Sequence, residues 1–446
     1  MPQNQANTLY LNNSNVGQHK SIPHSPLQTI QTLRAFFEGL CGYFYKSCAI
    51  FYDDPKNHIG QDKLSCQIKT KSKMKKIFVS ITLLFLLSCS DKKKADTETY
   101  FAGFKTIQTK DTTRIYKPNT DTTDYLHFRP LDIDVWYPAS ESTKDTSILF
   151  RNILGLLEKR ANYYTASNAA NGMTQQLAQY FCDGLKCSDS TKVLNFKTKS
   201  FKNAKPIEDK FPLIIYLSAF NGMSYENFSL FEELAKKGFV VASISSIGRF
   251  PGDMTMKNED LMEQVNDAIA TLNNLKGNSN IDFTKIGIIG YSWGGLSGSI
   301  LASKIPNVAC VISLDGSEFH HYGQAKEENI NFDGIRNSPD FKNMRISVPY
   351  LRLESSPLTT TEKEDSVYDF TEKLSSDRQI FKIDSAQHED FGCLPQLVKE
   401  SGNCKPNQHF KTILKLTISF LEDHLKNGKT FTETVGQEIN KTIRKK

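Results

Sequence analysis

The 446-residue sequence has little excess charge, only two tryptophans and no apolar run of membrane-spanning length. Lys and Arg exceed Asp and Glu by six in total. Residues 1–88 carry ten basic and four acidic side chains, so residues 89–446 are electrically balanced. A protein that binds nucleic acid normally carries a basic patch or stripe. The charge distribution therefore argues against nucleic acid as a partner.

The composition also excludes a disordered or fibrous chain. Hydrophobic residues make up 39%, aromatic residues 11% and charged residues 23%, which is ordinary for a folded soluble protein. No internal repeat is evident, and low-complexity sequence is confined to a short charged stretch at 90–99. The length predicts one or two domains.

The nine cysteines do not form the CxxC pairs that are typical of a zinc site, so we predict no metal site and assign no cofactor. In an oxidising compartment, Cys182 with Cys187 and Cys393 with Cys404 are close enough in sequence to form small disulfide loops. Cys310 lies in an apolar run and is predicted to be a buried free thiol.

Residues 74–88 have the pattern of an export signal. Met74 is followed by two lysines, an apolar stretch of about eleven residues and a small residue before Cys89. The apolar stretch is too short for a transmembrane helix, which needs about 20 residues. We interpret Met74 as the true start, so that residues 1–73 form an upstream leader absent from the mature protein.

The end of this signal, Leu86–Cys89, resembles the lipobox of bacterial lipoproteins. The resemblance implies cleavage before Cys89 and attachment of lipid to that residue, which would anchor the protein to a membrane of the cell envelope. Residues 89–99 would then be a polar tether, and residues 100–446 a single folded domain.

From about Tyr100 the sequence alternates strands and helices. Continuous apolar runs such as Pro212–Leu217 are typical of strands buried on both faces of a parallel sheet. The pattern predicts an α/β fold with a mostly parallel central sheet, helices on both faces and ligands at the carboxyl ends of the strands. A stretch at about 148–190 is helical without a clear strand and predicts a helical insertion. The expected strands are 131–138, 212–217, 239–244, 286–289, 308–314, 348–353 and 379–383, and the expected helices are 225–237, 261–275, 295–304 and 407–426.

The sequence 290–294 is a G-x-S-x-G pentapeptide centred on Ser292. It follows an apolar strand and precedes a predicted helix, which is the setting of a nucleophile elbow. In such a turn the small neighbours expose the serine hydroxyl, and the next backbone N–H, here that of Trp293, points at the developing oxyanion. Ser292 is therefore a candidate nucleophile.

A serine hydroxyl needs a histidine base and an acid that orients the histidine. His388 follows the strand at 379–383 and precedes the closing helix, where an α/β-hydrolase places its base. Two carboxylates end neighbouring predicted strands and could orient it. Asp315 is followed by a glycine that permits a tight turn, and Glu354 occupies the strand position more common in the superfamily.

Several segments together resemble the platelet-activating-factor acetylhydrolase and dienelactone hydrolase-like branch of the α/β-hydrolases, over about 101–425. They are 132–138, 213–222, 290–295, 314–316 and 386–388. The resemblance implies the α/β-hydrolase fold and a short-acyl or lipid-like ester substrate. It also favours Asp315 as the acid, because the acetylhydrolase branch carries its acid in a Leu-Asp motif after the strand that follows the nucleophile.

The first oxyanion loop departs from the family, since the frequent His-Gly pair is replaced by Ser218-Ala219. A backbone donor needs no particular side chain, so the N–H of Phe220 is the second expected oxyanion donor. The loop 247–252 is a candidate wall of the pocket.

The expected function is hydrolysis of carboxylic esters through an acyl-enzyme, with Ser292, His388 and Asp315 as the triad. One alternative is a serine peptidase of the prolyl-oligopeptidase type, although the space before Phe211 is too short and too helical for a β-propeller. The other is a non-catalytic lipoprotein that retains the fold and binds a ligand.

Overall fold

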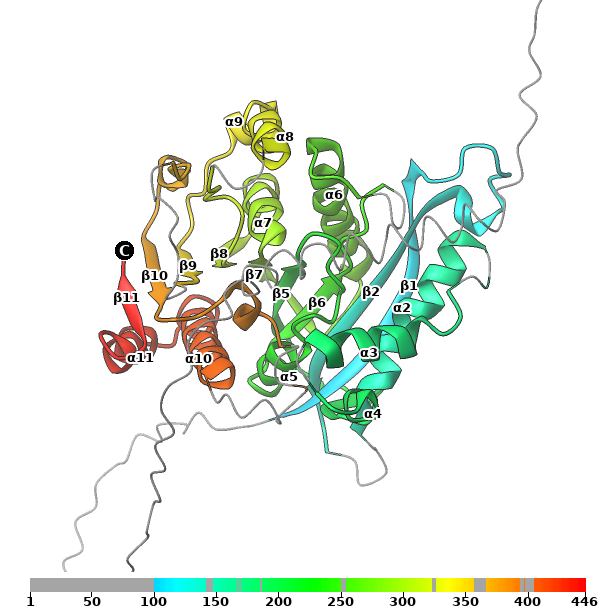
Figure 1. Ribbon diagram of the computed structural model, residues 1–446, viewed down its shortest axis with the longest axis horizontal. Coiled ribbons are helices and arrows are strands. Elements are labelled where there is room, and N and C mark those ends of the chain that lie inside the picture. Colours follow the sequence, from blue (N-terminus) through cyan, green and yellow to red (C-terminus); the bar gives the residue numbers. More distant parts are fainter. Residues whose placement is uncertain are drawn as a thin grey trace, which may run out of the picture.

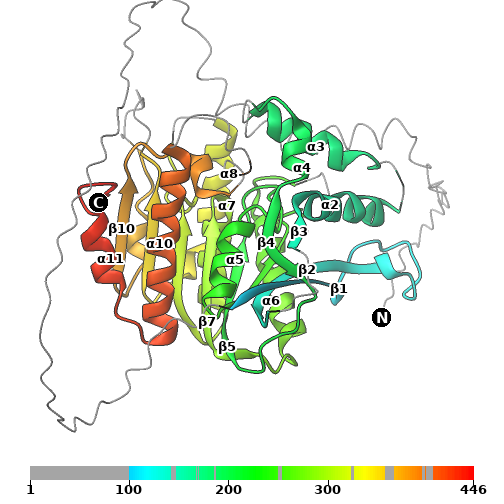
Figure 2. The ribbon, with the colours of Figure 1, turned by 90° about the horizontal axis from the view of Figure 1, so that it is seen from below.

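The computed structural model describes residues 100–141, 147–166, 168, 170–184, 187–249, 254–322, 326–356, 366–393, 397 and 405–446. The predicted leader, signal peptide, tether and lipidation site at Cys89 all lie outside these residues. Figures 1 and 2 show one sheet through the middle of the described chain, with helices packed on both sides of it.

The strands of the described residues form a single sheet in the order β11-β10-β9-β8-β7-β5-β6-β2-β1-β4-β3. The run from β10 through β6 is parallel throughout. Its strands are short apolar segments, and every residue of β5 is buried, as expected for a strand covered on both faces. The prediction of a mostly parallel central sheet is confirmed. These strands are β5 (Phe211–Leu217), β6 (Val240–Ile244), β7 (Ile281–Tyr291), β8 (Val308–Leu314), β9 (Tyr350–Glu354) and β10 (Arg378–Ile383).

Two apolar clusters cover the two faces of the sheet. Because side chains alternate along a strand, Ile214 and Tyr216 of β5 pack with α5 and α10, whereas Leu213 and Ile215 pack with α6 and α7. Gly238 follows α5 at φ +77°, the left-handed position predicted for it. No helix in the described ranges is both long and apolar enough to cross a membrane. The helices are α5 (Phe228–Lys236) and α10 (Lys405–Lys426) on one face, with α6 (Asn258–Leu275), α7 (Trp293–Lys304), α8 (Lys326–Arg336) and α9 (Pro339–Asn343) on the other.

The amino-terminal side of the sheet is antiparallel and carries the helical insertion. The long strands β1 (Phe101–Ile115) and β2 (Phe128–Ala139) form a hairpin, and β2 joins the parallel strands by pairing with β6. The insertion contains helices as predicted, but it opens with a strand that the helical pattern hid, because only one of its three residues is buried. The elements here are β3 (Ser147–Leu149), α2 (Phe150–Thr165), α3 (Met173–Gly184), α4 (Ser190–Leu194) and β4 (Lys197–Lys202).

A buried ion pair fastens the insertion to the sheet. Arg160 of α2 donates through Nη2 to Oδ1 of Asp134 at 2.7 Å and through Nη1 to Oγ of Ser224 at 3.1 Å. Asp134 is fully buried, and Arg160 is 6% exposed. Asp134 also accepts hydrogen bonds from Thr106 and Ser224, but its charge is balanced by Arg160, so the ion pair holds α2 on β2.

The carboxyl-terminal end extends beyond the predicted closing helix. After α10 the chain forms α11 (Phe431–Glu438) and then β11 (Ile443–Lys445), which pairs antiparallel with β10. The prediction that 379–383 supplies the last strand is therefore wrong. Only Ile443 of the three β11 residues is buried, so the segment carries almost no apolar pattern.

The described cysteines form one disulfide. Cys182 and Cys187 are bonded at the end of α3, as the sequence spacing allowed. Cys310 is a buried free thiol, which confirms its prediction. Cys393 is also a buried free thiol and donates to the backbone oxygen of Glu226. Cys404, the partner that the sequence spacing offered for it, lies outside the described residues.

Candidate active site

Ser292 lies in a sharp turn between the end of β7 and the start of α7. Its backbone angles are φ 54° and ψ −119°, a region that non-glycine residues adopt only when their surroundings hold them there. The flanking glycines explain how the turn forms. A Cβ on Gly290 would lie 2.1 Å from the carbonyl oxygen of Gly294, and one on Gly294 would lie 2.0 Å from that of Leu217. Both positions therefore require glycine, and the strand-turn-helix predicted around Ser292 is present.

His388 and Asp315 come from distant parts of the chain and form a hydrogen bond. His388 begins a 3-10 helix (His388–Phe391) after β10, and Asp315 follows the last residue of β8. His388 Nδ1 lies 2.7 Å from Oδ2 of Asp315. The other carboxylate oxygen of Asp315 accepts the backbone N–H of Ser355 at 2.8 Å. Both oxygens of Asp315 are thus engaged, and the imidazole is held by one of them.

The pKa values of the pair shift in opposite directions. Burial by itself raises the pKa of Asp315, but the hydrogen bond and charge of His388, together with the charge of Arg352, lower it to about 2. Burial by itself lowers the pKa of His388, but the hydrogen bond and charge of Asp315 raise it above the usual imidazole value. Asp315 is therefore ionised at neutral pH and stabilises a proton on His388.

Glu354, the alternative acid, has other partners. Its Oε1 accepts Nε of Arg352 at 2.7 Å and lies 3.2 Å from Nζ of Lys446. Burial raises the pKa of Glu354, and the charges of Arg352 and Lys446 outweigh that effect and lower it. Nδ1 of His388 donates to Asp315 and not to Glu354.

Tyr291, the residue before Ser292, holds the histidine against the elbow. The two rings stack with centroids 5.1 Å apart and an angle of 27° between their planes. The Tyr291 hydroxyl donates to the backbone oxygen of His388 at 3.0 Å. Sequence reasoning missed this role, because position two of the pentapeptide accepts many residues. An aromatic residue at that position was the available signal.

The two expected oxyanion donors lie on facing segments. Trp293 is the first residue of α7, and Phe220 lies in the loop after β5; their rings meet edge to face at 5.9 Å. Neither backbone N–H donates to an acceptor within the part of the chain that the structure describes. Gln264 of α6 links the two segments, since it donates to the backbone oxygen of Ser218 at 2.8 Å and accepts from Ser297 of α7 at 2.7 Å.

The loop 247–252 is described only through Arg249, so its predicted place in the pocket wall falls mostly outside the described residues. Gly248 has φ +63°. The backbone N–H and Nε of Arg249 both donate to Oδ1 of the fully buried Asp260 on α6. This contact anchors the start of the loop on α6.

Comparisons with known proteins agree with this architecture. Residues 212–333 match the family described as alpha/beta hydrolase fold. The structure is similar to a ferulic acid esterase from Streptomyces cinnamoneus, with a TM-score of 0.50 and 16% identity over 74% of this chain and 91% of that chain. A comparison with curated proteins gives no match. The chain has the α/β-hydrolase fold, which confirms the fold class predicted from the sequence.

Proposed function

We propose that this chain is a serine hydrolase that cleaves carboxylic esters, with Ser292 as nucleophile, His388 as general base and acid, and Asp315 as the acid that orients the histidine. The observation that carries the proposal is the hydrogen bond between His388 and Asp315 beside the strained turn at Ser292. A nucleophile on a strained turn and a histidine oriented by a carboxylate are the groups that acyl transfer through serine requires.

The reaction takes place in two steps, acylation of Ser292 and hydrolysis of the acyl-enzyme. The hydroxyl oxygen of Ser292 attacks the acyl carbon while its proton passes to Nε2 of His388, and the N–H groups of Trp293 and Phe220 stabilise the oxyanion. The C–O bond then breaks, and the alcohol leaves with the proton from His388. Water next attacks the acyl-enzyme, gives one proton to His388, and releases the carboxylic acid as Ser292 recovers its proton.

Two similarities favour carboxylic esters as the substrates. Similarity to an esterase structure and resemblance to the acetylhydrolase and dienelactone hydrolase-like branch favour esters, with short-acyl or lipid-like groups as the first candidates. We further propose that lipid on Cys89 anchors the enzyme in the cell envelope. The disulfide between Cys182 and Cys187 fits an oxidising compartment of that kind.

A fluorophosphonate probe tests the nucleophile. We expect it to label the folded wild-type protein and to fail on Ser292→Ala. Ser299→Ala is the matched control, because Ser299 is a buried hydroxyl of the same helix that donates only to the backbone oxygen of Gly295. Absence of labelling on folded wild-type protein would contradict the proposal and favour a non-catalytic binding protein.

Hydrolysis rates for p-nitrophenyl acetate, a longer p-nitrophenyl ester and a prolyl amide distinguish an esterase from a peptidase. We expect the esters to be cleaved and the amide to be left intact.

Partition of the full-length protein between detergent and water tests the proposed lipid anchor. Cys89→Ala is expected to move the protein into the aqueous phase.

A further inference from the structure

A buried glutamate lies behind the oxyanion loop (Ser218–Gly222). Oε1 of Glu226 accepts the backbone N–H of Ala219 at 2.9 Å and the hydroxyl of Tyr216 at 2.8 Å. Glu226 is 6% exposed, and burial raises its pKa to about 8. A carboxyl group in this position has lost most of its water, and its Oε1 is held by these two donors.

The loop wraps closely around this carboxylate. The N–H of Gly222 donates to the backbone oxygen of Ala219 at 2.7 Å and closes a tight turn, with Asn221 at φ +53°. A Cβ on Gly222 would lie 2.5 Å from Oε2 of Glu226. Since Ala219 immediately precedes Phe220, the bond to Glu226 sets the path of the backbone into the peptide whose N–H is the second oxyanion donor.

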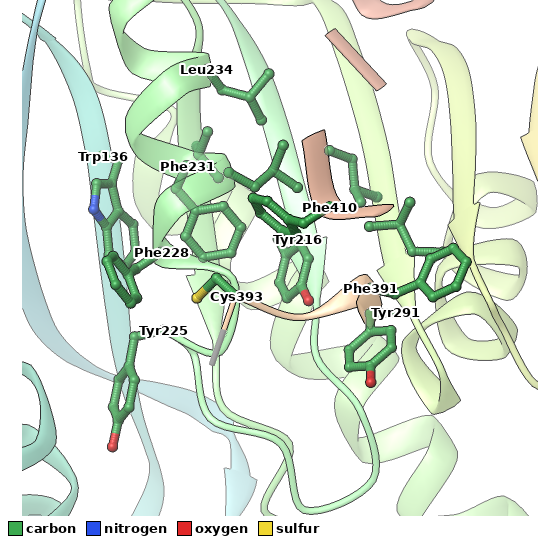
Figure 3. Packing of buried hydrophobic residues seen from close by; sticks show 14 of the residues in the cluster. Trp136, Tyr216, Tyr225, Phe228, Phe231, Leu234, Tyr291, Phe391, Cys393 and Phe410 are labelled. Atoms are coloured by element: carbon green, nitrogen blue, oxygen red, sulfur yellow. The ribbon is translucent and has the colours of Figure 1, made fainter. Parts of the chain in front are cut away.

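Glu226 and the residue after it also form hydrogen bonds with the segment that follows His388. The backbone oxygen of Glu226 accepts the N–H of Cys393 at 3.2 Å and its thiol at 2.9 Å. The next residue, Asn227, donates to the backbone oxygen of Phe391 at 2.9 Å and to the Tyr216 hydroxyl at 3.1 Å. Figure 3 shows Tyr216, Phe391 and Cys393 within one cluster of buried side chains.

We propose that Glu226 is a positioning residue of the reaction: its carboxylate directs the N–H of Phe220 toward the oxyanion and aligns the oxyanion loop with the segment that carries His388. This inference rests on the proposed function. A donor that is correctly aimed only at the charge of the transition state accelerates the chemical step more than it strengthens substrate binding. Loss of the anchor should therefore lower kcat and leave KM nearly unchanged.

The chain contains a matched control for this role. Glu232, on the neighbouring helix α5, is 2% exposed, and burial raises its pKa to about 7. Its Oε1 also accepts one backbone N–H, that of Lys199 at 2.7 Å, and one hydroxyl, that of Ser200 at 2.6 Å. These partners belong to β4, away from Ser292. Glu232 thus has the same burial and bonding chemistry without a link to the oxyanion loop.

The test compares kcat and KM for p-nitrophenyl acetate, together with the melting temperature, in wild type, Glu226→Ala, Glu226→Gln and Glu232→Ala. We expect Glu226→Ala to lose about 100-fold in kcat, the effect of one oxyanion donor, with KM within about threefold. Glu226→Gln keeps an oxygen acceptor for Ala219 and should recover kcat to within about tenfold of wild type. Glu232→Ala should lower the melting temperature and leave kcat nearly unchanged.

Equal kcat in Glu226→Ala and Glu232→Ala, with wild type active, would overturn this inference and leave the proposed function standing. An inactive wild type would overturn both. If Glu226→Ala does not fold, the kcat values of Glu226→Gln and Tyr216→Phe test the inference instead, because both variants retain the oxygen that accepts the N–H of Ala219. A 100-fold loss of kcat in either would contradict the role given to that acceptor.

Discussion

Replacing Asp315 with asparagine should invert the hydrogen bonding of His388. In the wild type, Oδ1 of Asp315 accepts the N–H of Ser355 and Oδ2 binds Nδ1 of His388. An asparagine must keep its oxygen facing the Ser355 N–H, so its amide nitrogen faces Nδ1. Nδ1 then accepts a hydrogen bond, and the imidazole proton moves to Nε2, where it blocks uptake of the proton from Ser292.

The expected loss follows from two contributions. The charge-assisted bond that stabilises the imidazolium is worth about 1.5–3 kcal/mol. In the reactive tautomer of the variant, the Nδ1–H of His388 faces the N–H of the introduced amide. Two donors facing each other in a partly buried site add a further cost of about 1–3 kcal/mol. Together these amount to about 2.5–6 kcal/mol, or a fall in kcat of about 10² to 10⁴ at about 1.4 kcal/mol per factor of ten.

The matched variant is Glu354→Gln, which changes a buried carboxylate at the end of the next strand. Its partners are Arg352 and Lys446, so kcat should stay within about tenfold of wild type. The assay is kcat for p-nitrophenyl acetate, with circular dichroism to confirm folding and Ser292→Ala to define background. The reasoning fails if Asp315→Asn retains more than a tenth of wild-type kcat, or if Glu354→Gln loses as much.

Two more outcomes follow from the site. The base acts only when it is neutral, so kcat/KM should rise with pH through the raised pKa of His388, above the usual imidazole value of about 6.5. A profile of kcat/KM against pH checks this. In Asp315→Asn the rise should move to lower pH. Gly294→Ala puts a methyl group against the carbonyl oxygen of Leu217, so we expect a fall of about 1–3 kcal/mol in stability and a loss of ester hydrolysis. Gly298→Ala, whose nearest neighbour would be a side-chain methyl at 3.1 Å, is its control in thermal unfolding, and equal effects of the two would speak against a special constraint at the elbow.

The sequence predicted the central sheet well, because its strands are continuous apolar runs and its turns carry glycine. The elbow is the clearest case, since each glycine of the pentapeptide faces backbone too closely to accept a side chain. The edge strands of the sheet were harder to predict. Three-residue strands such as β3 and β11 bury one residue each, and a single buried residue has no period to detect.

The contacts within the site could be predicted only in part. The pattern of strands brought Asp315 and Glu354 to the same edge of the sheet, but residue spacing does not determine which carboxylate reaches the imidazole. The role of Tyr291 depends on a hydrogen bond to His388, 97 positions away, and the contact between Glu226 and the segment after His388 depends on one to Cys393, 167 positions away. Contacts of that range are set by the packing of whole elements and leave no local pattern.

The buried pair formed by Arg160 and Asp134 fixes the first helix of the insertion, α2, on the sheet. Lifting α2 from the sheet would separate a guanidinium from its carboxylate in a site with almost no water, and breaking such a pair costs about 3–5 kcal/mol when one partner is left behind. We therefore expect the first helix of the insertion to move together with the sheet and not as a separate flap.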